Sequence, residues 1–231
     1  MDSVSVTCMI RNKEAVMFKA VVFDMDGVIT DTEKLYRRFQ MQEGLRRGVP
    51  EDVMVRACER IAGGNKFTNK EPFEAIVGRG IDYWDFRENV MINLDTHIRE
   101  NGVELKYGVV ETLRYLKDKG IKIGLATSTV KERAIKYLTS HDIYQYFDKL
   151  IFGNMVEHGK PAPDIYLKAC EELGVAPEEA IAVEDSINGI KSAGTAGLYP
   201  VMVVDLIQPN DEIKPYVKQV YDNMTRLREL I

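Results

Sequence analysis

Residues 18–27, FKAVVFDMDG, join a short apolar run to two aspartates and a glycine. The run shows no alternation of polar and apolar residues, and a segment of this kind is typical of a parallel strand that is buried on both faces. The two acids come where that strand would end. Because ligands of open α/β sheets bind beyond the carboxyl ends of the strands, we expect Asp24 and Asp26 to face a binding crevice.

Outward from this segment, short apolar runs alternate with amphipathic stretches, which predicts an α/β fold with a parallel sheet covered by helices on both faces. The interval after the first strand contains helical stripes but no convincing strand, and it is too long for a bare loop. We expect it to form a small helical second domain. The predicted strands are 18–23, 121–126, 150–152, 180–183 and 199–204; the predicted units are a flexible extension (1–16), a core (17–32 with 105–231) and the helical insert (33–104).

Composition narrows the classes of partner. The 231 residues are 45% hydrophobic and 29% charged, which is typical of a folded globular chain, and the net charge is −5. That charge offers no attractive field to nucleic acid or to an anionic membrane. Three dispersed cysteines, with no CxxC pair, indicate a reducing compartment. No apolar stretch approaches a membrane span of roughly 18 residues, so we expect a cytoplasmic protein, and we expect a monomer.

Asp24 and Asp26 can lie close together only if something neutralises their negative charges. Two carboxylates at close range repel each other unless a cation or a proton neutralises them, and Mg²⁺ with oxygen ligands suits this purpose. The ordinary alternative is a turn whose acids are solvated. A calcium-binding loop is excluded because Val28 and Leu35 occupy positions that would need oxygen ligands.

Three further segments place polar residues after predicted strands. Residues 127–129, TST, stand before a helical stretch and form either an anion site or a helix N-cap. Lys160 lies between glycine and prolines and is either a positioned cation or a solvated loop lysine. Glu184 and Asp185 are either site acids or part of a helix start. Asp24, Thr127, Lys160 and Asp185 are separated by 103, 33 and 25 residues, and one sheet edge would gather them all.

The segments FDMDGVITDTE, LATST, GKPAPDIY and VEDSINGI together resemble the four motifs of the haloacid dehalogenase superfamily, in the branch with a helical cap between the first two motifs. The resemblance spans residues 18 to about 205. It implies a Rossmann-like core, a mobile cap and Mg²⁺-dependent phosphoryl transfer through an aspartyl-phosphate. Carried over to this sequence, Asp24 is the nucleophile and Asp26 the general acid and base; Thr127, Ser128 and Lys160 bind phosphate; and Asp24, Asp26 (by its backbone carbonyl), Glu184 and Asp185 bind the metal.

Within that branch two activities compete. The chain is similar to sugar-phosphate phosphatases and to β-phosphoglucomutases, whose usual histidine is replaced here by Tyr36 and whose arginine-bearing cap loop is replaced by a segment containing Lys66. We therefore predict a phosphatase of a small phosphorylated metabolite, with the mutase as the alternative. A non-catalytic binding relative is a third hypothesis, although such chains usually lose an acid that is present here.

The remaining aromatic and imidazole side chains are predicted to be structural. His97 lies on an apolar stripe of the insert, and His141 and His158 lie in connections. Tyr83 and Trp84 are expected to fill the core of the insert, because they begin a helical stripe of large apolar residues.

Overall fold

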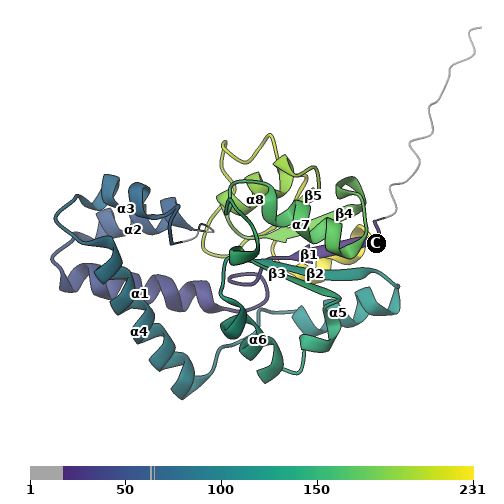
Figure 1. Cartoon of the computed structure of the whole chain (residues 1–231), viewed down its shortest axis with the longest axis horizontal. Helices are drawn as coiled ribbons and strands as arrows, with labels where there is room; N and C mark the ends of the chain where they lie inside the picture. Colours follow the sequence, from purple (N-terminus) through teal and green to yellow (C-terminus); the bar gives the residue numbers. More distant parts are fainter. Residues whose placement is uncertain (1–17, 63, 65) are drawn as a thin grey trace, which may run out of the picture.

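The computed structural model describes residues 18–62, 64 and 66–231, so the predicted extension 1–16 lies outside the described residues. A parallel sheet stands beside a group of helices (Figure 1). The sheet has the order β3-β2-β1-β4-β5-β6, and every neighbouring pair is parallel. Its strands are β1 (Ala20–Phe23), β2 (Lys122–Thr127), β3 (Lys149–Phe152), β4 (Ala180–Glu184), β5 (Tyr199–Val203) and β6 (Gln219–Tyr221).

Helices cover both faces of the sheet, as predicted, and the fold class is confirmed. Along β1, Val21 and Phe23 face the layer of α5 (Val109–Asp118) and α6 (Lys131–Ser140), whereas Ala20 and Val22 face α7 (Asp164–Leu173) and α8 (Ile187–Thr195). This division follows from the period of two in a strand. All four residues are fully buried, so β1 is the centre of the core.

The sixth strand was missed by the sequence prediction. β6 has three residues at the sheet edge, and its central Val220 is 39% exposed. A strand this short, with one exposed apolar residue, carries neither a buried apolar run nor a full alternation. It is a strand because it pairs with the neighbouring β5, and the sequence of the segment alone gives no sign of that pairing.

Four helices follow β1 before the chain returns to the sheet: α1 (Thr32–Arg46), α2 (Glu51–Ile61), α3 (Lys70–Val77) and α4 (Tyr83–Asn101). They pack on one another through aromatic contacts, among them Phe73 and Phe86 with ring centroids 4.7 Å apart. We propose that residues 33–104, hereafter the cap, form the predicted second domain. Among the described residues, no helix is both long and apolar enough to cross a bilayer.

One prediction for the cap was wrong. Tyr83 is 2% exposed and belongs to the cap core, but Trp84 is 41% exposed and packs at the surface. Consecutive residues of a helix are separated by about 100° around its axis, so neighbours at the start of α4 face different environments.

Two segments connect the cap to the core, and they run side by side. Thr30 forms an antiparallel bridge with Leu105. Nearby, Lys106 Nζ lies 3.2 Å from Asp31 of the first connection and 2.6 Å from Asp205, which follows β5. The two connections are therefore joined to each other and tied to the sheet edge that carries the acids.

Candidate active site

Three acids converge at the carboxyl edge of the sheet. Asp24 follows β1, Glu184 ends β4 and Asp185 comes next, and the parallel pairing of β1 with β4 sets them side by side. One ligand oxygen from each of these three lies within 4.8 Å of the others. Their exposed fractions are 8%, 0% and 6%. The sequence-based expectation that these strand ends share one crevice therefore agrees with the geometry.

Lys160 lies between two of these acids. Its Nζ donates to Asp24 Oδ1 at 2.5 Å, to Glu184 Oε1 at 2.6 Å and to the carbonyl oxygen of Ala126 at 3.1 Å. The side chain is 1% exposed, so it is not a solvated loop lysine. All three ammonium donors have acceptors, and Asp24 is oriented through one of its two carboxylate oxygens.

Glu184 receives further donors that sequence reasoning did not identify. Tyr166 donates its hydroxyl to Oε1 at 2.6 Å, and Ser186 Oγ donates to Oε2 at 3.1 Å. Gly189 leaves room for this carboxyl group, because a Cβ at that position would lie about 2.0 Å from it. Tyr166 stands in the GKPAPDIY motif, but the motif gave no sign that its hydroxyl contacts Glu184.

Asp26 is held by hydroxyl groups instead of a cation. Thr129 donates its hydroxyl to Asp26 Oδ2 at 2.5 Å, and Thr32 donates to Oδ1. The carboxyl group of Asp26 is not part of the three-acid cluster. Any contact of this residue with a metal would thus use its main-chain carbonyl, as the resemblance implies. Thr32 was not identified from the sequence, although it stands six residues after Asp26.

The predicted anion-binding residues after β2 differ in accessibility. Thr127 is fully buried, and its Oγ1 accepts a hydrogen bond from the Thr129 N–H at 3.0 Å. Ser128 and Thr129 line the cavity described below. The turn therefore presents Ser128 and Thr129 to a ligand, with Thr127 beneath them.

The site carries more negative charge than Lys160 can balance. Burial raises the pKa of Asp24 to about 8, Lys160 opposes this, and Glu184 and Asp26 reinforce it. Burial, then the charges of Glu184 and other acids, holds the pKa of Asp185 well above its usual range. Within the described part of the chain, no hydrogen bond to the carboxyl group of Asp185 is present. Buried carboxylates with unused oxygen donors fit a hard divalent cation such as Mg²⁺.

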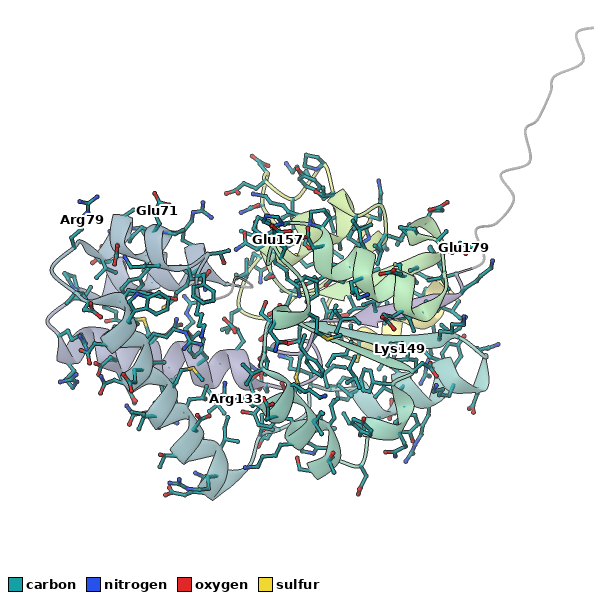
Figure 2. The ribbon with its side chains drawn as sticks, in the orientation of Figure 1. Glu71, Arg79, Arg133, Lys149, Glu157 and Glu179 are labelled. Carbon is teal, nitrogen blue, oxygen red and sulfur yellow. The ribbon has the colours of Figure 1, made fainter. Side chains whose placement is uncertain are left out.

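A cavity of about 150 Å³ lies between the cap and the sheet edge. Asp24, Asp26 and Asp185 line it from the core, and Tyr36 and Lys66 line it from the cap. None of the three histidines, all of which the structure describes, lines this cavity. The helices α1 and α4 approach the core at this border, where Arg133 of α6 lies (Figure 2).

Comparison with known proteins agrees with this arrangement. The profile of haloacid dehalogenase-like hydrolases matches residues 18–197. The chain belongs to this hydrolase family. A phosphorylated carbohydrates phosphatase of Thermotoga maritima is 36% identical over 185 residues, covering 78% of this chain and 82% of that protein. The β-phosphoglucomutase of Bacillus subtilis is 32% identical over 200 residues, covering 80% and 83%. CbbY from Rhodobacter sphaeroides, solved in complex with phosphate, superposes with a TM-score of 0.72 at 26% identity, covering 91% of this chain and 96% of that one.

These matches confirm the family that the four motifs predicted and confirm that the chain is a hydrolase of the haloacid dehalogenase type. Both phosphatases and a mutase occur among the named relatives, which is the same pair of activities that the sequence left open.

Proposed function

We propose that this protein is a Mg²⁺-dependent phosphatase of small phosphorylated metabolites, in particular sugar phosphates, and that it acts through an aspartyl-phosphate on Asp24. The observation that carries the proposal is the geometry around Asp24: a buried carboxylate oriented by Lys160 at 2.5 Å, with Asp26 two residues away, facing a cavity closed by the cap. This is the arrangement that nucleophilic attack on a phosphoryl group requires.

In the first step, a carboxylate oxygen of Asp24 forms a bond to phosphorus and the ester P–O bond breaks. Lys160 holds Oδ1, which leaves Oδ2 for the attack. A Mg²⁺ ion held by Asp24, Asp185 and the main-chain oxygen of Asp26 would supply the positive charge that offsets repulsion between carboxylate and phosphate. Ser128, just before α6, provides its hydroxyl and N–H groups for the phosphoryl oxygens, because Thr129 donates its own hydroxyl to Asp26 and its N–H to Thr127.

Asp26 serves as the proton donor and acceptor. Its carboxyl group protonates the leaving ester oxygen in the first step and takes a proton from the attacking water in the second, which releases phosphate and restores Asp24. The hydroxyls of Thr32 and Thr129 fix its orientation. The cap, which supplies much of the cavity wall, limits access of bulk water and selects the substrate.

The substrate class is supported by the relatives. The phosphatase of Thermotoga maritima is named for phosphorylated carbohydrates, and hexitol phosphatase B of Escherichia coli is 28% identical over 196 residues. The mutase is the second candidate because the Bacillus subtilis relative is a β-phosphoglucomutase. Transfer to a sugar hydroxyl in place of water would need the same Asp24 and Asp26 chemistry.

Phosphate release from p-nitrophenyl phosphate, with Mg²⁺ or with EDTA, tests the proposal. We expect Mg²⁺-dependent turnover that Asp24→Asn abolishes. Asp118→Asn, the same change at an exposed acid of α5, is the matched control and should keep full activity. Turnover by Asp24→Asn would refute the nucleophile, and absence of any turnover in the wild type would favour the non-catalytic alternative. β-Glucose 1-phosphate with a trace of the 1,6-bisphosphate separates the activities, since a mutase yields glucose 6-phosphate and a phosphatase yields free phosphate.

The metal has a readout that does not depend on activity. A ligand that binds only the folded state stabilises it by RT ln(1 + [L]/Kd), or about 2.7 kcal/mol at a hundredfold excess over Kd. We expect Mg²⁺ to raise the urea midpoint of the wild type and to have a smaller effect on Asp185→Asn. An equal effect on both proteins would place the ion elsewhere.

A further inference from the structure

Helix α1 supplies one long wall of the cavity. The residues of this helix that line it are Thr32, Glu33, Tyr36 and Gln40. Their spacing of three or four residues places them on one side of the helix. Thr32 donates its hydroxyl to Asp26, so this end of the wall lies at the catalytic acids. Gln40 is the last of the four and, at about 1.5 Å per residue, lies about 12 Å further along the helix axis than Thr32. The cavity therefore extends from the acids into the cap alongside α1.

Gln40 is a buried polar residue whose side chain has no partner. It is 2% exposed, yet its amide makes no hydrogen bond with any residue that the structure describes. Among the described residues, the buried polar side-chain atoms that lack both a partner and accessible surface are Thr112 Oγ1 and Asp205 Oδ2. The amide of Gln40 keeps some accessible surface, and the space that it faces is the cavity. A buried amide without a hydrogen bond costs free energy, so its partner comes from what occupies the cavity.

The other cap helices contribute a wall that is mostly apolar. The lining residues that come from α2 and α4 are Cys58, Ile61, Arg87, Met91 and Leu94. Ligand sites commonly combine such an apolar wall with a few placed polar groups, and those groups fix the orientation of the ligand and give specificity. Gln40 is uncharged, buried and open to the cavity, so it is suited to this task.

We propose that Gln40 binds one hydroxyl group of the substrate and makes that hydroxyl a condition of efficient hydrolysis. This inference rests on the proposed function and narrows its substrate class to polyhydroxylated phosphate esters, with a hydroxyl remote from the phosphate that is cleaved. An amide carries both a donor and an acceptor, and so does a hydroxyl, so each group can satisfy the other. A carboxylate or a phosphate would use only the N–H groups and would leave the carbonyl oxygen of Gln40 unpaired.

The position of Gln40 sets the size of the ligand that reaches it. A two-carbon phosphate ester held at Asp24 would end well before Gln40, whereas the carbon chain of a hexose phosphate extends along α1 toward it. A ligand that reaches the amide without offering a hydroxyl displaces water from it and leaves it unpaired. Sites built to bind a hydroxyl reject analogues that lack it for this reason.

Hydrolysis of glucose 6-phosphate and of its 1-, 2-, 3- and 4-deoxy analogues tests this inference. In the wild type, we expect kcat/KM for one of the analogues to be about 10-fold or more below that of the parent compound, the range for an amide that is left unpaired. In Gln40→Met, which keeps an unbranched side chain of similar length, kcat/KM for the parent compound should fall to the level of that analogue. The value for the analogue itself should not fall, because it lacks the hydroxyl that Gln40 binds.

A matched variant and a stability measurement separate recognition from structure. Gln42→Met makes the same change at an exposed position of α1 outside the cavity and should leave kcat/KM for all five compounds unchanged. An unpartnered buried amide that is replaced by an apolar side chain should leave the urea midpoint of Gln40→Met unchanged or raise it. A lower midpoint together with an equal loss of kcat/KM for all five compounds would overturn the proposal. Equal kcat/KM for all five compounds in the wild type would overturn it as well.

A binding measurement keeps this result apart from the proposed function. Calorimetry with Asp24→Asn and with Asp24→Asn/Gln40→Met gives the Kd values of the five compounds without turnover. We expect the first variant to bind the parent compound about 10-fold or more tightly than the discriminated analogue, and the second variant to bind these two alike. The same order of affinities without hydrolysis by the wild type would refute the phosphatase and leave the hydroxyl site standing. Hydrolysis with equal affinities, or no binding of any of the five compounds, would refute the hydroxyl site.

Discussion

Replacing Lys160 by methionine tests whether this lysine holds the site together. The change keeps an unbranched side chain of similar length but removes three hydrogen bonds, of 2.5, 2.6 and 3.1 Å. Asp24 and Glu184 then remain buried, at 8% and 0% exposed, without the cation between them. Removing one partner of a buried ion pair leaves an uncompensated charge and typically costs about 3–5 kcal/mol of the free energy of unfolding.

Two features of the site limit that loss. Glu184 keeps its hydrogen bonds from Tyr166 and Ser186, and Asp24 can take up a proton, which avoids the full cost of a buried charge. We therefore expect a value near the lower end of the range, about 3 kcal/mol at pH 7.

The assay is urea unfolding followed by far-UV circular dichroism, with EDTA present so that no divalent ion replaces the lost charge. Lys149→Met is the matched control. This lysine of β3 pairs with Glu172 at 3.2 Å, and the side chains of both residues are more than a third exposed. Such a pair contributes less than about 1 kcal/mol. A loss for Lys160→Met within about 1 kcal/mol of the control would refute the reasoning that Lys160 compensates the buried acids.

Three other predictions follow from single contacts. Gly189→Ala should destabilise the protein by more than about 1 kcal/mol in urea unfolding, since its Cβ would lie about 2.0 Å from the Glu184 carboxyl group; unchanged stability would contradict the close approach. Thr129→Val removes a hydroxyl donor to Asp26 and should lower kcat about 10-fold or more with little change in unfolding, as steady-state assays with p-nitrophenyl phosphate can check. Hydrogen bonds from arginines hold the pKa of Glu43 below its usual range, so its stabilisation is present above the unfolded-state pKa and lost as pH falls. The unfolding free energy lost in Glu43→Gln should therefore be full at pH 7 and shrink below about pH 4; a pH-independent loss would contradict this sign.

The sequence identified the acids and the lysine because their positions follow from a rule about sheets. Parallel strands end at one edge, so Asp24, Asp185 and the residues after β2 could be placed together without knowing how any helix packs. Lys160 was placed by its spacing from these segments. The predicted α/β fold and the family were found for the same reason.

The residues that were missed depend on packing between distant elements. Tyr166 reaches Glu184 because α7 covers a face of the sheet, and Gly189 matters only because α8 begins beside the same carboxyl group. Thr32 contacts Asp26 after the chain turns into α1. Arg87 was not identified from the sequence, because only the position of α4 against the core turns it toward the cavity.

The hydrogen bonds of Lys160 also indicate which of its two possible roles, binding phosphate or orienting Asp24, is the main one. The family resemblance assigned it to the phosphoryl oxygens, but its three donors are engaged by Asp24, Glu184 and a carbonyl group. A contact to substrate would exchange one of these acceptors, and the carbonyl bond, at 3.1 Å, is the longest. We therefore infer that Lys160 chiefly orients the nucleophile. Under the proposed function, the charge that receives the phosphate would then come from N–H groups near Ser128 and from a cation held by Asp24 and Asp185, because an additional anion cannot bind beside unbalanced acids.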